Sequence, residues 1–143
     1  MARILFIEEE DFGMEGLISE LRDNKHEVIV VGDGETAIKS LRNGKHDFQL
    51  IILDVMLPIG EPTESPPAVS EEIKTDEMGL EILRQMRQEM NDQTPVIVLT
   101  AAIDIDLRTR INEFGVEKYF SKPTSLEDFI EAVNNVLSPE ISG

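Results

Sequence analysis

The 143-residue sequence contains no cysteine and no tryptophan, and it has only one tyrosine. The lack of cysteine excludes disulfide bonds, thiolate metal ligands and thiol nucleophiles, and it agrees with a reducing, cytoplasmic location. Long apolar runs are missing too, since no segment reaches the length of a membrane-spanning helix. The N-terminus passes from a short apolar stretch straight into acidic residues, unlike a secretory signal. We therefore expect no membrane partner.

Basic residues are scarce as well. Thirteen lysines and arginines stand against 29 aspartates and glutamates, and the formal net charge is -16. Such a charge repels nucleic acids and anionic membrane surfaces, so we expect no direct contact with nucleic acid. Bound cations or basic protein partners fit this charge better. The length fits a single domain, and a hydrophobic fraction of 41% is enough for a sizeable core.

Short apolar segments predict five β-strands. Four are rich in β-branched residues and the last is weaker; they span residues 3–7, 27–32, 50–54, 95–100 and 117–121. Continuous apolar runs of this length indicate strands that are buried on both faces, as in a parallel sheet. The stretches between them carry apolar residues at helical spacing. This alternation predicts an α/β fold with right-handed crossovers and helices on both faces of the sheet.

The last predicted helix has a recognisable start. In the sequence TSLE, Thr124 is a candidate cap with Glu127 three residues further on, and Ser125 is the alternative cap. Gly44 and Gly115 stand where glycines end helices. The two histidines, His26 and His46, lack metal-ligand spacing, and we expect both at the surface.

Polar side chains collect where the predicted strands end. Glu8 and Glu9 follow the first strand, Asp54 ends the third, Thr100 ends the fourth and Lys122 follows the fifth. Ligands of open α/β sheets bind outside the carboxyl ends of the strands, so these side chains should share one site. Three neighbouring carboxylates repel one another, which favours raised pKa values or a bound cation. Mg²⁺ suits such oxygen ligands and leaves room for a phosphoryl oxygen.

These side chains suit phosphoryl transfer. Asp54 is the candidate nucleophile, whose carboxylate would attack phosphorus and form an acyl phosphate. Lys122 would pair with one phosphoryl oxygen, and the Thr100 hydroxyl would hydrogen-bond another. Each residue also has a plainer explanation. Asp54 is equally typical of a turn cap after a strand, and the acidic run Glu8 to Asp11 is typical of a solvated helix start.

An ordered set of segments resembles the receiver domain of two-component response regulators, the CheY-like family. The segments are RILFIEEED, IILDVMLP, MGLEILRQMR, PVIVLTA and YFSKP, and together they cover nearly the whole chain. The resemblance implies the flavodoxin-like (βα)5 fold, a doubly wound parallel sheet with strand order 2-1-3-4-5. It also implies a signalling protein rather than an enzyme. Such a receiver catalyses only its own phosphorylation and slow dephosphorylation.

The family implies partners and a metal ion. A sensor histidine kinase or a histidine phosphotransfer protein would supply the phosphoryl group, and a downstream effector protein would respond to it. Asp54 matches the phospho-acceptor of the family. Glu8 and Glu9 match the acidic pair that binds Mg²⁺, with Asp54 and the main-chain carbonyl of Met56 as further metal ligands.

The remaining site residues are implied in the same way. Thr100 matches the switch hydroxyl and Lys122 matches the lysine that pairs with the phosphate. Pro123 matches the proline that follows this lysine, which the family usually holds in the cis form. Tyr119 matches the aromatic residue whose rotamer changes when the hydroxyl moves toward the phosphate.

The second acid departs from the family pattern. The family usually has aspartate at this position, whereas this chain has Glu9. The extra methylene moves the carboxylate by about one bond length, and Mg²⁺ tolerates poor octahedral geometry badly. We therefore predict weaker metal binding or a shifted ligand set, with Glu10 and Asp11 as substitutes.

The loop after Asp54 departs further. Pro58 and Gly79 lie 21 positions apart, whereas the corresponding proline and glycine of the family lie four apart, so the chain has 17 additional residues here. This 59–77 segment is acidic and contains three prolines, which is typical of a long loop. We interpret residues 1–143 as a single receiver domain in which this segment gates access to Asp54 or adds a partner surface.

Two other functions compete with a phosphorylated receiver. One is a phosphorylation-independent interaction module, similar to a receiver but with an impaired Mg²⁺ site. The other is a phosphohydrolase with an aspartyl nucleophile. Many such enzymes place a second aspartate two residues after the nucleophile as general acid, whereas this chain has Met56 there.

Overall fold

A computed structural model describes residues 2–8, 14–42, 46–61, 69, 72–73, 77–101, 105–122 and 124–137. Within these residues five parallel strands form one sheet in the order β2-β1-β3-β4-β5, as predicted. The strands are β1 (Arg3–Ile7), β2 (Glu27–Val31), β3 (Leu50–Leu53), β4 (Val96–Thr100) and β5 (Lys118–Ser121). Each strand agrees with its predicted bounds to within one residue. For the first four strands the reason is that continuous β-branched runs mark buried parallel strands clearly.

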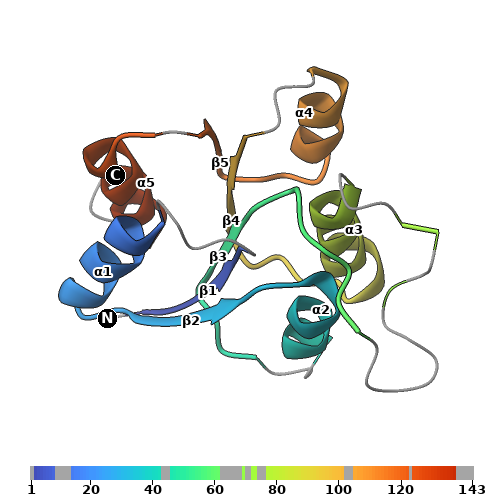
Figure 1. Cartoon of the computed structure of the whole chain (residues 1–143), viewed down its shortest axis with the longest axis horizontal. Helices are drawn as coiled ribbons and strands as arrows, with labels where there is room; N and C mark the ends of the chain where they lie inside the picture. Colours follow the sequence, from blue (N-terminus) through green and yellow to red (C-terminus); the bar gives the residue numbers. More distant parts are fainter. Residues whose placement is uncertain are drawn as a thin grey trace.

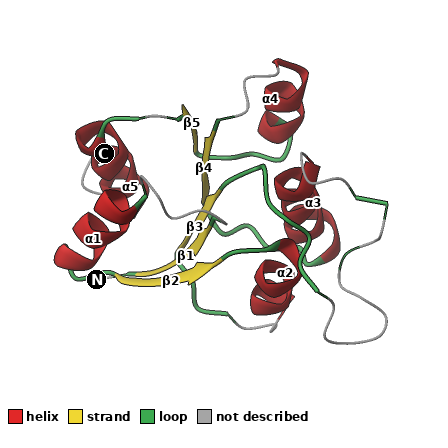
Figure 2. Ribbon diagram, viewed as in Figure 1, coloured by secondary structure: helices red, strands yellow, loops and turns green. Residues whose placement is uncertain are grey.

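Helices cover both faces of the sheet, with α1 and α5 on one side and α2, α3 and α4 on the other (Figure 1). Figure 2 shows the strands as a yellow layer between these red helices. The helices are α1 (Glu15–Asp23), α2 (Gly34–Arg42), α3 (Met78–Arg84), α4 (Ile105–Asn112) and α5 (Leu126–Leu137), and a π-helical stretch, η2 (Gln85–Glu89), continues α3. The arrangement is the predicted doubly wound α/β fold.

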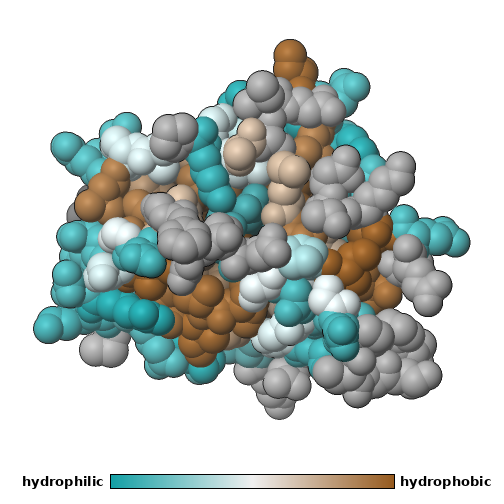
Figure 3. Space-filling view, viewed as in Figure 1, coloured by the Kyte–Doolittle hydropathy of each residue, from teal (hydrophilic) through white to brown (hydrophobic). Residues whose placement is uncertain are grey.

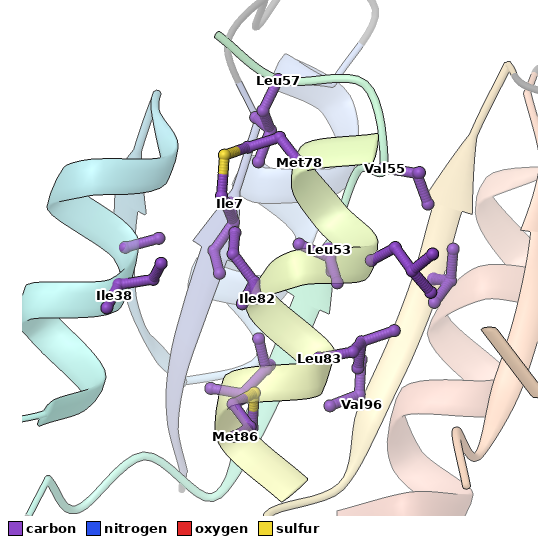
Figure 4. Close-up of a cluster of buried hydrophobic side chains, with 14 of the residues drawn as sticks. Ile7, Ile38, Leu53, Val55, Leu57, Met78, Ile82, Leu83, Met86 and Val96 are labelled. Carbon is purple, nitrogen blue, oxygen red and sulfur yellow. The ribbon is translucent and has the colours of Figure 1, made fainter. Parts of the chain in front are cut away.

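The core consists of two apolar clusters, one on each face of the sheet. Successive strand residues point to opposite faces, so Leu5 and Ile7 of β1 belong to one cluster while Ile4 and Phe6 belong to the other. Strands β1, β3 and β4 are buried almost completely, and their apolar side chains stabilise the fold by about 2 kcal/mol each. Figure 4 shows how α3 packs onto the sheet through Ile82, Leu83 and neighbouring side chains.

The edge strands β2 and β5 are less buried than the central ones. Apolar side chains gather over the region of β1 and β2 in the space-filling view (Figure 3). Val30 of β2 is among the few large apolar side chains that are exposed. Among the described residues, no helix has the length and apolar character needed to cross a membrane.

Three local predictions have different outcomes. The Ser125 hydroxyl caps α5 by accepting a hydrogen bond from the Asp128 amide at 2.9 Å, so the alternative cap is the correct one. Gly115 follows α4 with φ at 77°, as expected of a helix-ending glycine, whereas Gly44 lies outside the described residues. The surface position expected for His46 is wrong. Its Nε2 atom lies 2.6 Å from an Asp92 carboxylate oxygen, and both side chains are nearly buried.

Candidate functional site

Three of the predicted site residues follow strands and are held by the sheet itself. The Glu8 amide donates a hydrogen bond of 2.9 Å to β2, and the Asp54 amide donates one of 2.9 Å to β1. The Lys122 amide donates one of 2.8 Å to the last residue of β4. Each bond extends the parallel ladder by one residue beyond the strand. The backbone at these positions is therefore as well fixed as the strands, and all three residues lie at the carboxyl edge of the sheet.

The side chains of these three residues meet. The Lys122 ammonium donates hydrogen bonds to a Glu8 oxygen at 2.5 Å and to an Asp54 oxygen at 3.2 Å. The other Asp54 oxygen accepts a hydrogen bond of 3.1 Å from the Met56 amide, so both oxygens of this carboxylate are oriented. Glu8 is 4% exposed and Asp54 is 7% exposed. The carboxylate in the sequence IILDVMLP is thus paired, and it still reaches the protein surface at this edge.

The electrostatics of the cluster follow from burial. Desolvation, together with the neighbouring Asp54, raises the pKa of Glu8 from 4.5 to about 7, although the Lys122 ammonium acts against this shift. Burial alone would lower the pKa of Lys122, but its hydrogen bond to Glu8 and the charge of Asp54 raise this pKa overall. Two carboxyl groups share one ammonium ion. The cluster can therefore bind a further cation at neutral pH.

Thr100 and Tyr119 lie on the neighbouring strands β4 and β5. Thr100 is completely buried at the end of β4, and it is paired with Ser121 of β5. Tyr119 lies on β5 and is half-buried, with the Arg108 guanidinium of α4 4.9 Å from the centre of its ring. Burial raises the pKa of the Tyr119 hydroxyl, and Arg108 opposes this rise. The two predicted switch residues thus lie on neighbouring strands, between the acceptor edge and α4.

Helix α3 begins in close contact with the acceptor backbone. The Gly79 amide donates a hydrogen bond of 2.8 Å to the Val55 carbonyl. A Cβ atom on Gly79 would lie 2.4 Å from the Val55 Cα and 3.0 Å from the Asp54 carbonyl oxygen. Only glycine fits this approach. This role of Gly79 was not predicted from the sequence, although a glycine at the start of an apolar helix is a signal for close packing.

Two predicted site residues, Glu9 and Pro123, lie outside the described residues, as do Glu10 and Asp11. Among the described residues, no three acidic or histidine side chains form a cluster that could hold a metal ion. The described groups that could act as metal ligands are the carboxylates of Glu8 and Asp54, which share the single ammonium of Lys122. One or two carboxylates are what a protein usually offers Mg²⁺, so this donor set fits the ion.

The chain resembles known proteins in its amino-acid sequence. A family model described as response regulator receiver domain matches residues 72–134. Transcriptional regulatory protein CiaR of Streptococcus pneumoniae is 30% identical over 128 residues, which are 90% of this chain and 48% of that protein. Response regulator ArlR of Staphylococcus saprophyticus is 28% identical over 137 residues, 96% of this chain and 53% of that protein. The chain spans about half the length of these curated relatives.

Solved structures are similar as well. The non-phosphorylated HemR receiver domain from Leptospira biflexa has a TM-score of 0.74 and 25% identity, and the match covers 96% of this chain and 95% of that one. A CheY-like receiver domain protein from Methanospirillum hungatei has a TM-score of 0.75 and 18% identity, with coverage of 100% and 99%. The fold is the one that these receiver domains share. The chain is thus similar to response regulator receiver domains both in sequence and in fold.

Proposed function

We propose that Asp54 is the residue that accepts the phosphoryl group in this receiver. The observation that carries the proposal is the bridge from the Lys122 ammonium to both Glu8 and Asp54 at the carboxyl edge of the sheet. A nearly buried carboxylate needs a compensating charge, and a mobile ammonium supplies it without blocking the oxygen permanently. The same ammonium is then available to a phosphoryl oxygen.

Transfer proceeds by substitution at phosphorus. An Asp54 oxygen forms the new bond to phosphorus while the bond from phosphorus to the histidine nitrogen of the donor breaks, and the leaving imidazole takes up a proton. The Lys122 ammonium turns from the carboxylate to a phosphoryl oxygen and stabilises its negative charge. The Met56 amide keeps the second Asp54 oxygen in place during the attack.

Mg²⁺ is part of this proposal. Glu8, Asp54 and the Met56 carbonyl are the described groups that would hold it, and the ion would offset the charge of the incoming phosphate. Glu9 is proposed as a further ligand with a longer side chain than the family aspartate. The binding of a divalent ion next to Glu8 favours the ionised form of this carboxyl group, so metal binding is coupled to the loss of a proton.

The switch is proposed to run through Thr100 and Tyr119. A hydrogen bond from the Thr100 hydroxyl to the phosphoryl group would draw the end of β4 toward Asp54. Tyr119 lies on the adjacent strand, where Arg108 covers its ring. A change in the Tyr119 rotamer must break this cation–π contact, which weakens the connection between β5 and α4. The face of α4 and β5 is thereby altered for an effector protein.

The proposed partners are a sensor histidine kinase or a histidine phosphotransfer protein as donor and a protein effector as target. The CiaR and ArlR relatives are regulators of about twice this length, and their names support a place in two-component signalling. Autocatalysed phosphorylation, slow dephosphorylation and a cytoplasmic location belong to the same proposal. So does the interpretation of residues 1–143 as one receiver domain that contains the 59–77 segment.

Incubation with acetyl phosphate and Mg²⁺ tests this function without a kinase. Intact-protein mass spectrometry should show the addition of one phosphoryl group to the wild type, and Asp54→Asn should show none. Omission of Mg²⁺ should slow the reaction strongly. A wild-type protein that is folded and yet unmodified would favour the phosphorylation-independent module instead.

A further inference from the structure

A second buried carboxylate lies away from the acceptor cluster. Glu35, in the first turn of α2, is only 1% exposed. One of its oxygens accepts a hydrogen bond of 2.9 Å from the Val69 amide. Its other oxygen is buried and has no hydrogen-bond partner among the described residues. A buried carboxylate with an unpartnered oxygen costs stability, so its place in the molecule calls for an explanation.

The main chain of the same residue holds a different part of the protein. The Glu35 amide donates a hydrogen bond of 2.8 Å to the Ile59 carbonyl, and the neighbouring Gly34 amide donates one of 2.9 Å to the Pro58 carbonyl. These two carbonyls belong to residues 54–59, here called the acceptor loop, which leads directly into the 59–77 segment. The first turn of α2 therefore uses its free amides to fasten this loop. Glu35 is thus hydrogen-bonded to two segments. Its amide donates to the acceptor loop, and its carboxylate accepts a hydrogen bond from the Val69 amide.

Val69 is the middle of the 59–77 segment, and it is part of the core. Its side chain is 2% exposed and belongs to the same apolar cluster as Leu57 and Met78. Figure 4 shows Leu57 beside Met78, at the end of the core nearest to the acceptor loop. Val69 is consequently held in place both by the burial of its apolar side chain and by the hydrogen bond from its amide to the Glu35 carboxylate.

The acceptor loop is short and tightly constrained between its two ends. At one end the Met56 amide holds an Asp54 oxygen, and at the other the Pro58 and Ile59 carbonyls bind the first turn of α2. Leu57 between them is fully buried. Only Leu57 and Pro58 separate Met56 from Ile59, whose carbonyl is bound by the Glu35 amide.

We propose that Glu35 is a positioning residue that couples the 59–77 segment to the acceptor loop. A partner that holds or displaces Val69 would change the position of the first turn of α2, and through it the geometry at Met56 and the reactivity of Asp54. The hydrogen bond between Val69 and Glu35 is thus a regulatory input to phosphorylation. This inference rests on the proposed acceptor role of Asp54.

The first test measures coupling in the metal-free, unphosphorylated protein by amide hydrogen exchange. Glu35→Met removes the acceptor of the Val69 hydrogen bond and keeps the side-chain volume, whereas Glu35→Gln keeps an oxygen acceptor. Exchange at the Met56 amide should become about fivefold faster in Glu35→Met and stay unchanged in Glu35→Gln. Exchange at Ile52, in the centre of the sheet, reports global opening and should rise less than that at Met56.

The second test is a double-mutant cycle with Val69→Pro, which removes the donor of the same hydrogen bond. Val69→Ala is the control because it keeps the amide. If Glu35 acts through Val69, the double variant should show the same Met56 exchange as either single variant. Additive effects, or an equal rise at Met56 and Ile52, would overturn the proposal. If Val69→Pro does not fold, the comparison of Glu35→Met with Glu35→Gln decides alone.

The third test connects coupling to function. Glu35→Met should lower the maximal rate of phosphorylation by acetyl phosphate about fivefold, and Glu35→Gln should restore most of it. Equal rates in both variants would contradict a regulatory role. A failure of the proposed function looks different. In that case the wild type itself would not be phosphorylated, while the coupling between Val69 and Met56 would still be measurable by exchange.

Discussion

The ammonium nitrogen of Lys122 lies 3.2 Å from a carboxylate oxygen of Asp54, although 68 positions separate the two residues in the chain. The strands bring them together, because β5 and β3 flank β4 and all three end at the same edge. The same nitrogen also contacts Glu8. One cation therefore compensates two nearly buried carboxyl groups.

Removal of the ammonium should destabilise the metal-free protein. Lys122→Met leaves Glu8 and Asp54 facing each other without compensation, and we expect a loss of about 3 kcal/mol in the free energy of unfolding. Lys118→Met, an exposed lysine of β5, is the control and should change stability by less than about 0.5 kcal/mol. Urea denaturation measures both. Mg²⁺ should stabilise the Lys122 variant more than the wild type, and an equal effect on both would contradict a shared charge site.

The pKa of Glu8 predicts how stability depends on pH. Its folded value of about 7 lies above the ordinary value of 4.5, so the folded state binds the proton more tightly than the unfolded state. The stabilisation from this proton is complete below pH 4.5 and is lost as the pH rises through 7. Relative to Glu8→Gln, the metal-free wild type should therefore become less stable across this window. Urea midpoints that differ by a constant amount at every pH would refute the assignment.

Gly79 should be the most sensitive glycine among those described. A Cβ atom there would collide with the backbone of Val55, so Gly79→Ala should cost about 2 kcal/mol or more and should slow the phosphorylation of Asp54. Gly16 in α1 is the matched control, since a Cβ atom there meets nothing within 4 Å. Gly16→Ala should stabilise the protein by about 0.5 kcal/mol. Thermal unfolding of both variants compares the two sites directly.

The fluorescence of Tyr119 offers a direct report of the switch. The chain has one tyrosine and no tryptophan, so emission excited in the tyrosine band comes from this residue alone. Phosphorylation of Asp54 should change this emission because the ring leaves the Arg108 guanidinium. Asp54→Asn should show no change with acetyl phosphate. Arg108→Gln should alter the emission before any phosphorylation, and an unaltered signal would argue against the stacked ground state.

Much of the fold was predictable because the relevant signals are local. The β-branched runs around Ile4, Ile51 and Ile97 mark strands buried on both faces, and their alternation with helices leaves few possible topologies. Part of the candidate site followed from the same signals, since Asp54 follows such a run, whereas Lys122 follows the weaker fifth segment. The strand order came from the resemblance to receivers, and the structure confirms it.

Contacts between distant segments were not predictable in the same way. Glu35 is an acid in the first turn of a helix, where acids are common, and nothing local marks it as buried or as the partner of Val69. The position of His46 was predicted wrongly for the same reason, because its partner Asp92 lies 46 positions away in the chain. The direct contact of Lys122 with Glu8 was missed as well, since phosphate pairing was the only role foreseen for Lys122.

The position of the phosphoryl group tests the central claim most directly. After reaction with acetyl phosphate and Mg²⁺, reduction with borohydride converts a phosphorylated aspartate into homoserine, which is then located by peptide sequencing in a mass spectrometer. We predict homoserine at position 54 and at no other acidic residue. Homoserine elsewhere in the chain, or unmodified Asp54 in a protein that carries phosphate, would contradict the account.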